Sequence, residues 1–252
     1  MTADDFADLL ALVPKGCTAK ATLPSPSVTH FFRGDDMIKG SPYMTRAAYL
    51  DDVCAVYRQE VADLAKLGCT YLQIDEVPCA VLCDPRNQAL VKNRGENAES
   101  LIDEYLAAIN AAVRDRPAGM TVCVHLCRGN LGHGQASGGY EPIAEQLFND
   151  LEVDGFFLEY DTDRSGDFRP LRHLPKDKLV VLGLVSTKLP ELEPAGDIKR
   201  RIEEASRYVD IDRLCLSPQC GFASGYKTSR FALDDQERKL AHIVQVAGEV
   251  WG

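Results

Sequence analysis

The run Leu179-Val180-Val181-Leu182-Gly183-Leu184-Val185 contains no charged or hydrogen-bonding side chain and shows no alternation between apolar and polar positions. A strand with one face in water alternates, whereas a strand of a parallel sheet is buried on both faces and stays apolar throughout. This run therefore predicts a strand buried on both faces and covered by helices. No other stretch of the chain restricts the fold as strongly.

Similar runs alternate along the chain with amphipathic segments of helical periodicity, which is the pattern of a parallel α/β sheet or barrel. We predict strands at Ala19–Leu23, Tyr71–Asp75, Thr121–Leu126, Gly155–Tyr160, Leu179–Leu184 and Arg213–Ser217. Helices are predicted at Ala3–Leu12, Arg46–Leu67, Ala98–Arg114, Glu141–Asp150, Asp197–Tyr208 and Asp234–Val250. Gly68 is placed to close the second helix in a left-handed conformation.

The composition limits the number of domains and the class of partner. With 252 residues, 45% of them hydrophobic, the chain can bury the core of one α/β barrel or of two small domains. Because no linker interrupts it, we predict a single domain over residues 1–252. The net charge of -10 leaves no general basic surface for phosphate backbones, so nucleic acid is excluded as a partner.

Targeting signals and cysteine usage indicate the compartment. The apolar runs are shorter than the roughly 20 residues that span a bilayer, and the segment Met1–Phe6 is acidic, unlike a signal peptide. Nine cysteines are dispersed over the chain, an odd number that argues for reduced thiols rather than a disulfide framework. We therefore predict a cytoplasmic protein without a membrane partner.

Metal-binding residue types stand at the ends of three predicted strands. His125 and Cys127 are two residues apart, so a strand directs both side chains to the same face. The carboxyl ends of strands in βα folds converge on one site. Histidine, cysteine and carboxylate side chains are the ligands of zinc. The predicted ligands are His125, Cys127, Glu159 and Cys220.

Each of these residues also has an ordinary structural interpretation. Cys127 and Cys220 can be buried core thiols, and His125 can be a hydrogen-bonded core histidine. The place of Cys127 beside His125, and of Cys220 before Gly221, each at the end of a strand, favours metal binding. For Glu159, direct ligation and a place in a hydrogen-bond network are equal alternatives, since a carboxylate ending a buried strand needs a partner of either kind.

Four further residues at strand ends are predicted to contact substrate. Asp75 and Glu76 follow a buried strand, where an acid can hold the ammonium of an amino acid; the alternative is a salt bridge to a loop arginine. Arg128 and Asn130 follow the predicted ligands directly. Because a metal-bound thiol is deprotonated at neutral pH, this site suits alkyl transfer to sulfur.

Five segments resemble the C-terminal catalytic barrel of the cobalamin-independent methionine synthase family, and most closely its short single-barrel relatives. They occur in the expected order and cover nearly the whole chain. The segments are Thr22–Pro26, Leu72–Glu76, Val124–Asn130, Asp154–Asp161 and Leu216–Phe222. The resemblance implies a TIM (β/α)8-type barrel of the methionine synthase and uroporphyrinogen decarboxylase-like kind, here lacking its first two strands.

The resemblance also implies roles for individual residues. His125, Cys127, Glu159 and Cys220 would bind a catalytic Zn²⁺, and Asp75 would contact the amino group of a homocysteine-like acceptor. Asp75 and Glu159 are thus the predicted catalytic carboxylates. The implied reaction, a step of methionine biosynthesis, transfers a methyl group to homocysteine or a similar small thiol, as in the 5-methyltetrahydropteroyltriglutamate-homocysteine S-methyltransferases.

The chain departs from the full synthases in one functional position. Val185 stands where they carry a histidine assigned to proton handling, so the resemblance does not extend to folate as the methyl donor. One alternative is a zinc alkyltransferase that uses another electrophile, an epoxide with a thiol cofactor or a methyl corrinoid. Another is an inactive zinc-binding domain completed by a partner chain. The missing strands would expose sheet edges and so favour a homo-oligomer.

Overall fold

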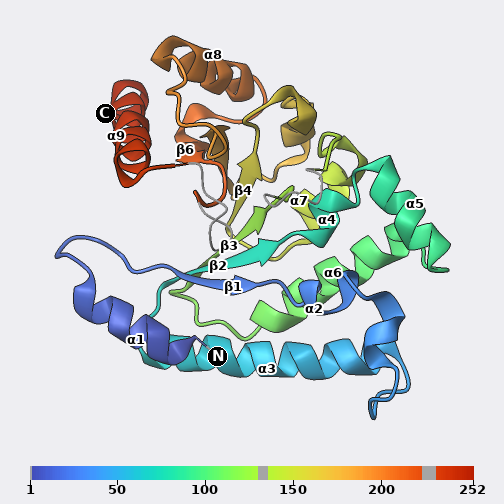
Figure 1. Ribbon diagram of the computed structural model, residues 1–252. Helices are drawn as coiled ribbons and strands as arrows, with labels where there is room; N and C mark the ends of the chain where they lie inside the picture. Colours follow the sequence, from blue (N-terminus) through green and yellow to red (C-terminus); the bar gives the residue numbers. More distant parts are fainter. Residues whose placement is uncertain (1, 130–135, 223–230) are drawn as a thin grey trace. The chain divides into compact units, whose positions relative to one another are not determined.

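The sheet of this computed structural model, which describes residues 2–129, 136–222 and 231–252, has six strands (Figure 1). Each strand is hydrogen-bonded to the next one in the chain, in the order β1-β2-β3-β4-β5-β6. The strands are β1 (Ala21–Pro24), β2 (Tyr71–Glu76), β3 (Thr121–Leu126), β4 (Gly155–Glu159), β5 (Leu179–Val185) and β6 (Leu214–Pro218). The predicted α/β class and all six predicted strands are confirmed.

The chain forms two compact units, Met1–His125 with Asp150–Asp154, and Leu126–Asn149 with Gly155–Gly252. In the first unit β1 and β2 pair in parallel, with Thr22 opposite Gln73. Helices of this unit are α1 (Ala3–Leu12), α2 (Val28–Phe31), the 3-10 helix η1 (Gly34–Ile38), α3 (Arg46–Lys66), α4 (Pro78–Val81), α5 (Pro85–Asn93) and α6 (Ala98–Val113).

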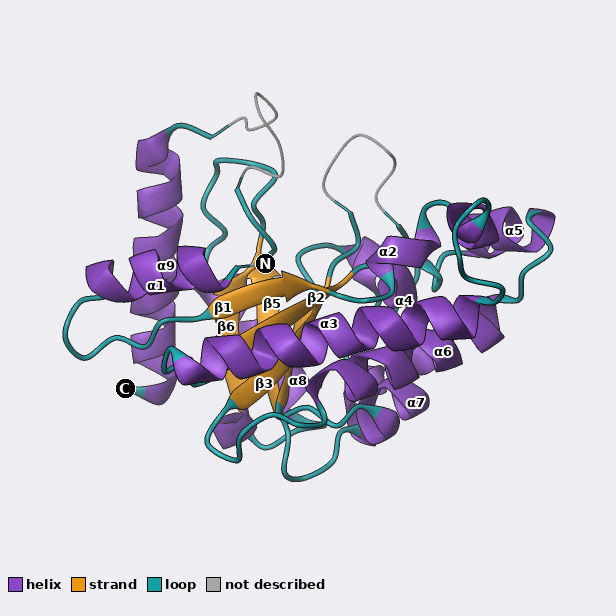
Figure 2. Ribbon diagram, turned by 90° about the horizontal axis from the view of Figure 1, so that it is seen from below, coloured by secondary structure: helices purple, strands orange, loops and turns teal. Residues whose placement is uncertain are grey.

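Helix α3 attaches to both the strands and the helices of its unit (Figure 2). Tyr57 donates a hydrogen bond of 2.6 Å from its hydroxyl to the carbonyl of Pro24 in β1. The thiol of Cys54 donates to the carbonyl of Ala108 in α6 at 3.3 Å. The buried side of α3 thus forms one core with β1 and α6.

The end of α3 follows the predicted glycine rule. Gly68 has φ of +91°, the amide of Gly68 donates to the carbonyl of Ala65, and the amide of Cys69 donates to that of Leu64, each at 3.0 Å. These two bonds form a Schellman motif, which satisfies carbonyls that the helix end would otherwise leave open. The motif turns the chain directly into β2.

The second unit is built around β5, which pairs in parallel with β4 and β6. Leu182 lies opposite Leu158 on one side and Leu216 on the other. The helices of the second unit are η2 (Glu141–Ile143), α7 (Ala144–Asp150), η3 (Asp163–Ser165), η4 (Arg169–His173), α8 (Ala195–Ser206), η5 (Ile211–Arg213) and α9 (Leu233–Trp251). Helix α8 packs on β5 and α9 on β6, so the apolar run is covered as predicted.

Short helices account for most differences from the sequence prediction. The segment directly after β2 forms the four-residue helix α4, with Pro78 in its first turn. Proline is compatible with this position because the first helical amides need no partner within the helix.

Within the described residues, no helix is long and apolar enough to cross a membrane.

Substituting Gly68→Ala should lower the free energy of unfolding by about 1 kcal/mol, because a side chain at this positive φ is strained although no atom lies within 4 Å of the added carbon. Gly119→Ala is the matched control, since Gly119 has equal space and no positive φ. Urea unfolding would measure both. Equal midpoints for the two variants would contradict the conformational explanation.

Candidate metal centre

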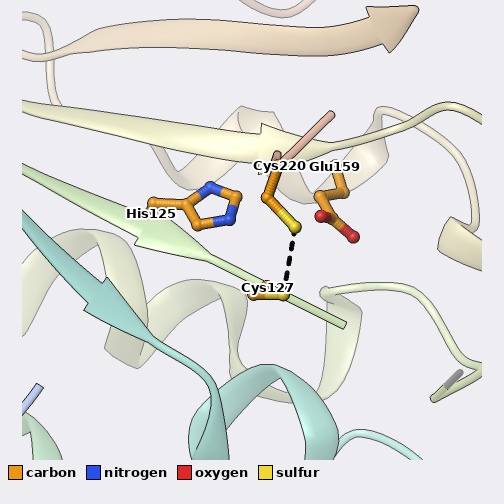
Figure 3. A group of neighbouring side chains, drawn as sticks. All are labelled: His125, Cys127, Glu159 and Cys220. Carbon is orange, nitrogen blue, oxygen red and sulfur yellow. Dashed lines mark hydrogen bonds between the residues drawn. The ribbon is translucent and has the colours of Figure 1, made fainter. Parts of the chain in front are cut away.

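Four side chains that the sequence predicts as ligands lie together in the structure. One donor atom from each of His125, Cys127, Glu159 and Cys220 lies within 4.8 Å of the other three. Figure 3 shows the side chains pointing toward one another. The predicted convergence of strand ends is therefore observed, while binding of an ion by this group stays a prediction.

Strand geometry explains how the group forms. His125 lies on β3 and Cys127 follows the strand, so the two-residue spacing keeps both on one face. Glu159 is the last residue of β4, and Cys220 follows β6 by two residues. His125 and Glu159 are buried, whereas both cysteines are partly exposed.

The two thiols lie close without being bonded covalently. Their sulfur atoms are 3.4 Å apart, well beyond the length of about 2.0 Å of a disulfide. Two sulfurs bound at about 2.3 Å to one tetrahedral zinc ion would lie about 3.8 Å apart. The pKa of the Cys220 thiol is raised by its hydrogen bond with Cys127, by burial and by the charge of Glu159. A divalent cation bound there would supply the positive charge that favours ionisation of the Cys220 thiol.

Glu159 is oriented by neighbours of its own unit. Its Oε2 atom accepts hydrogen bonds from Nε2 of Gln219 at 3.0 Å and from the backbone amide of Arg128 at 3.3 Å. Its own amide donates to the hydroxyl of Tyr140 at 3.0 Å. Arg164 places Nη2 at 3.7 Å from Oε2 and at 3.4 Å from Oδ1 of Asp161. The carboxylate thus has a fixed orientation before any ion arrives.

The backbone on either side of Cys220 is held by the end of β5. The amide of Gln219 donates to the carbonyl of Val185 at 2.8 Å, and the hydroxyl of Thr187 donates to the carbonyl of Cys220 at 2.6 Å. Both Gln219 and Thr187 are buried. No sequence motif marks Thr187 or Tyr140 as part of this group. The position of Gln219 directly before a predicted ligand was the available signal.

The predicted substrate residues Asp75 and Glu76 have different surroundings. Strand alternation sends them to opposite faces of β2. Asp75 is partly exposed and accepts a hydrogen bond from Gln73 at 2.6 Å. Glu76 is fully buried, accepts hydrogen bonds from Ser27 and from the amide of Cys79, and has a pKa raised by burial. The geometry therefore favours Asp75 as the substrate contact.

Of the two predicted substrate residues that follow the ligands, Arg128 is described by the structure and Asn130 is not. The guanidinium of Arg128 is fully buried, lies 4.1 Å from the ring centre of Tyr140 and donates a hydrogen bond to the carbonyl of Gly138. Substrate contact by Arg128 stays a prediction, and its burial instead supports a role in holding the segment that contains Gly138 and Tyr140. Asn130 lies outside the described residues.

A second group, His30, Asp35 and Glu96, also has donor atoms within 4.8 Å of one another. Nη1 of Arg46 lies 2.9 Å from Oδ1 of Asp35 and 3.1 Å from Oε1 of Glu96. Because an arginine already pairs with both carboxylates, this group is an ion-pair cluster that requires no metal. The four-residue group at the ends of β3, β4 and β6 is the candidate metal centre.

Residues 31–249 match the family model for the catalytic domain of the cobalamin-independent synthase. The chain belongs to this family. It is 42% identical over 236 residues to the uncharacterised Bacillus subtilis protein YxjH and 43% identical over 236 residues to YxjG of the same organism. Both alignments cover 93% of the chain and 62% of the Bacillus protein, so the chain spans about three fifths of the length of these relatives.

More distant relatives carry a functional name. A methionine synthase of Pyrococcus abyssi is 27% identical over 179 residues, which cover 71% of this chain and 44% of that protein. A Listeria monocytogenes structure, provisionally assigned as a vitamin-B12-independent methionine synthase, has a TM-score of 0.75 and 33% identity over 99% of this chain and 69% of its own. A B12-independent methionine synthase of Shewanella has the same TM-score at 18% identity, over 99% and 66%, and shows the shared fold.

Replacing Cys220→Ser should abolish stoichiometric zinc binding, because the hydroxyl is a much weaker ligand than a thiolate. Cys215→Ser is the matched control, since Cys215 lies on β6 outside the group of four. Metal analysis after dialysis against zinc would compare the two. Retention of one equivalent of zinc by the Cys220 variant would refute the centre.

Gln219→Leu should weaken zinc affinity by about 10- to 100-fold, as expected when a residue that orients a ligand is lost. The variant removes the bond to Glu159 and leaves all four candidate ligands in place. Ser217→Ala serves as control, because the hydroxyl of Ser217 bonds only the carbonyl of Pro218 among the described residues. Competition with a chelator would measure affinity; equal values would show that Gln219 does not orient Glu159.

Proposed function

We propose that this chain is a zinc-dependent methyltransferase domain that transfers a methyl group to the sulfur of homocysteine or a similar small thiol. The observation that carries the proposal is the group of two partly exposed thiols, a buried imidazole and a buried carboxylate within 4.8 Å. Membership of the cobalamin-independent synthase family and the name of the Pyrococcus relative support the reaction class.

The donor set fits zinc better than the hard cations of oxygen-only sites, because two of its four members are thiols. The residues that would hold the ion are His125, Cys127, Glu159 and Cys220. Zinc bound there would lower the pKa of an acceptor thiol, so that the nucleophilic thiolate exists at neutral pH. Oε2 of Glu159 accepts hydrogen bonds from two N–H groups, and these bonds hold the carboxylate in place.

Asp75 is the proposed partner of the amino group of the acceptor. It lies at the carboxyl end of β2, and β2 is the hydrogen-bonded neighbour of β3, which carries His125. Its partly exposed carboxylate can accept a hydrogen bond from an ammonium group, which orients the acceptor by a charged contact. Glu76, on the buried face of the same strand, anchors the backbone rather than the substrate.

The end of β5 limits the choice of methyl donor. Val185 is buried, and its carbonyl accepts the amide hydrogen of Gln219. A valine cannot give a proton to a leaving group, and the nitrogen of a methylated folate requires one when it departs. We therefore propose a methyl donor whose leaving group needs no proton from residue 185. A methyl corrinoid is such a donor.

Zinc-loaded protein incubated with homocysteine and methylcobalamin should form methionine, with methyltetrahydrofolate giving little product. Cys127→Ser should reduce the rate by about 1,000-fold, because loss of the metal removes several kcal/mol of activation of the thiol. Cys215→Ser should keep the rate of the unsubstituted protein. Mass spectrometry of the products measures the outcome; failure of the cobalt-substituted protein to show a sulfur-to-metal absorption band with homocysteine would refute the proposed function.

A further inference from the structure

Three side chains of the first unit form a hydrogen-bonded line that ends at Asp75. Nζ of Lys20 donates to Oε1 of Gln73 at 2.7 Å, and Nε2 of Gln73 donates to Oδ1 of Asp75 at 2.6 Å. Lys20 precedes β1, whereas Gln73 and Asp75 are two residues apart on one face of β2. We call these three residues the relay.

Lys20 determines the orientation of the side-chain amide of Gln73 within the relay. A lysine ammonium only donates hydrogen bonds, so the amide of Gln73 must turn its oxygen toward Lys20. The amide NH₂ then faces Asp75, where the carboxylate only accepts. The opposite orientation would place a carbonyl oxygen against a carboxylate oxygen. The ammonium therefore fixes the amide in the one orientation that binds Asp75.

Lys20 is itself held at this position. It is partly buried, and its ammonium lies 4.8 Å from the ring centre of Tyr71, within the range of a cation–π contact. Burial lowers the pKa of Lys20, and the charges of Cys123 and Asp75 act in the opposite direction. An ammonium in such surroundings stays with its partners, unlike an exposed lysine that samples many rotamers.

Asp75 has one engaged oxygen and one available oxygen. Within the described part of the chain, Gln73 is the residue whose side chain donates to this carboxylate, and it donates to Oδ1. Asp75 is partly exposed, so Oδ2 can accept a hydrogen bond from a bound molecule. With Oδ1 tied to Gln73, the rotamer of Asp75 and hence the position of Oδ2 are fixed before the molecule binds.

We propose that Gln73 and Lys20 are positioning residues that make the site selective for thiols carrying an α-amino group. Lys20 orients the amide of Gln73, Gln73 orients Asp75, and Oδ2 of Asp75 accepts the hydrogen bond of the ammonium. This inference rests on the proposed function, in which Asp75 contacts the amino group of the acceptor. It adds that recognition depends on two residues that do not touch the substrate.

The decisive comparison uses two thiols that differ in the amino group alone, homocysteine and 4-mercaptobutyrate. In the cobalt-substituted protein, the sulfur-to-metal absorption band reports binding of each thiol without any turnover. Gln73→Leu should weaken homocysteine binding by about 10-fold, the effect of losing a hydrogen bond to a charged group, and leave 4-mercaptobutyrate unchanged. Thr22→Ala is the control, because Thr22 lies opposite Gln73 on β1 and is exposed.

Variants at Lys20 test the orientation of the amide and do not depend on folding of the Gln73 variant. Lys20→Met should weaken homocysteine binding selectively, and Lys20→Arg should restore it because a guanidinium also only donates. Lys20→Glu should weaken binding more than Lys20→Met, since a carboxylate attracts the NH₂ of Gln73 and turns its oxygen toward Asp75. Thermal unfolding of each variant would confirm an intact fold.

The outcomes separate the inference from the function on which it rests. If the unsubstituted protein binds neither thiol at the metal, the proposed function and this inference both fail. If it binds homocysteine, and the Gln73 and Lys20 variants weaken both thiols equally or neither of them, the relay does not position Asp75 and the inference alone is overturned. Selective loss for homocysteine, with rescue by Lys20→Arg, establishes it.

Discussion

Parallel pairing of β4, β5 and β6 is the constraint on which the second unit depends. Gly183 of β5 lies opposite Glu159 of β4 and Ser217 of β6. A side-chain carbon at Gly183 would lie 3.0 Å from the carbonyl oxygen of Leu158 and 3.5 Å from that of Pro218. The glycine therefore allows the three strands to close together where Glu159 ends its strand and the segment leading to Cys220 begins.

Charge balance explains why such a group of side chains is tolerated. Arg164 is shared between Glu159 and Asp161, so its single positive charge already serves two carboxylates. Ionising both thiols would add two negative charges to a partly buried place, which is costly unless a divalent cation arrives with them. The N–H groups of Gln219 and Arg128 meanwhile hold the Glu159 carboxylate in one orientation.

Periodicity and strand-end position predicted the features that depend on local sequence. The six strands and the convergence of His125 with Cys127 and Cys220 follow from alternation and from the common edge of parallel strands. The helices α2 and α4, with four residues each, are too brief to show a helical repeat. Contacts between distant residues were beyond prediction: Tyr140 bonds a strand 19 positions later, and Lys20 reaches a side chain 53 positions away.

The adjacent acids Asp75 and Glu76 lie on opposite faces of β2, and the proposed role of Asp75 depends on the hydrogen bonds of both residues. On the buried face, Glu76 accepts from Ser27, in the segment after β1, and from the amide of Cys79 in α4. The carbonyl of Asp75 accepts from the amide of Ser25 at 2.9 Å. These bonds fix the backbone around Asp75 to the segment after β1 and to the start of α4. Gln73 and Lys20 can position the carboxylate of Asp75 only if the backbone of Asp75 is already fixed. The hydrogen bonds of the buried Glu76 therefore support the proposed role of its partly exposed neighbour.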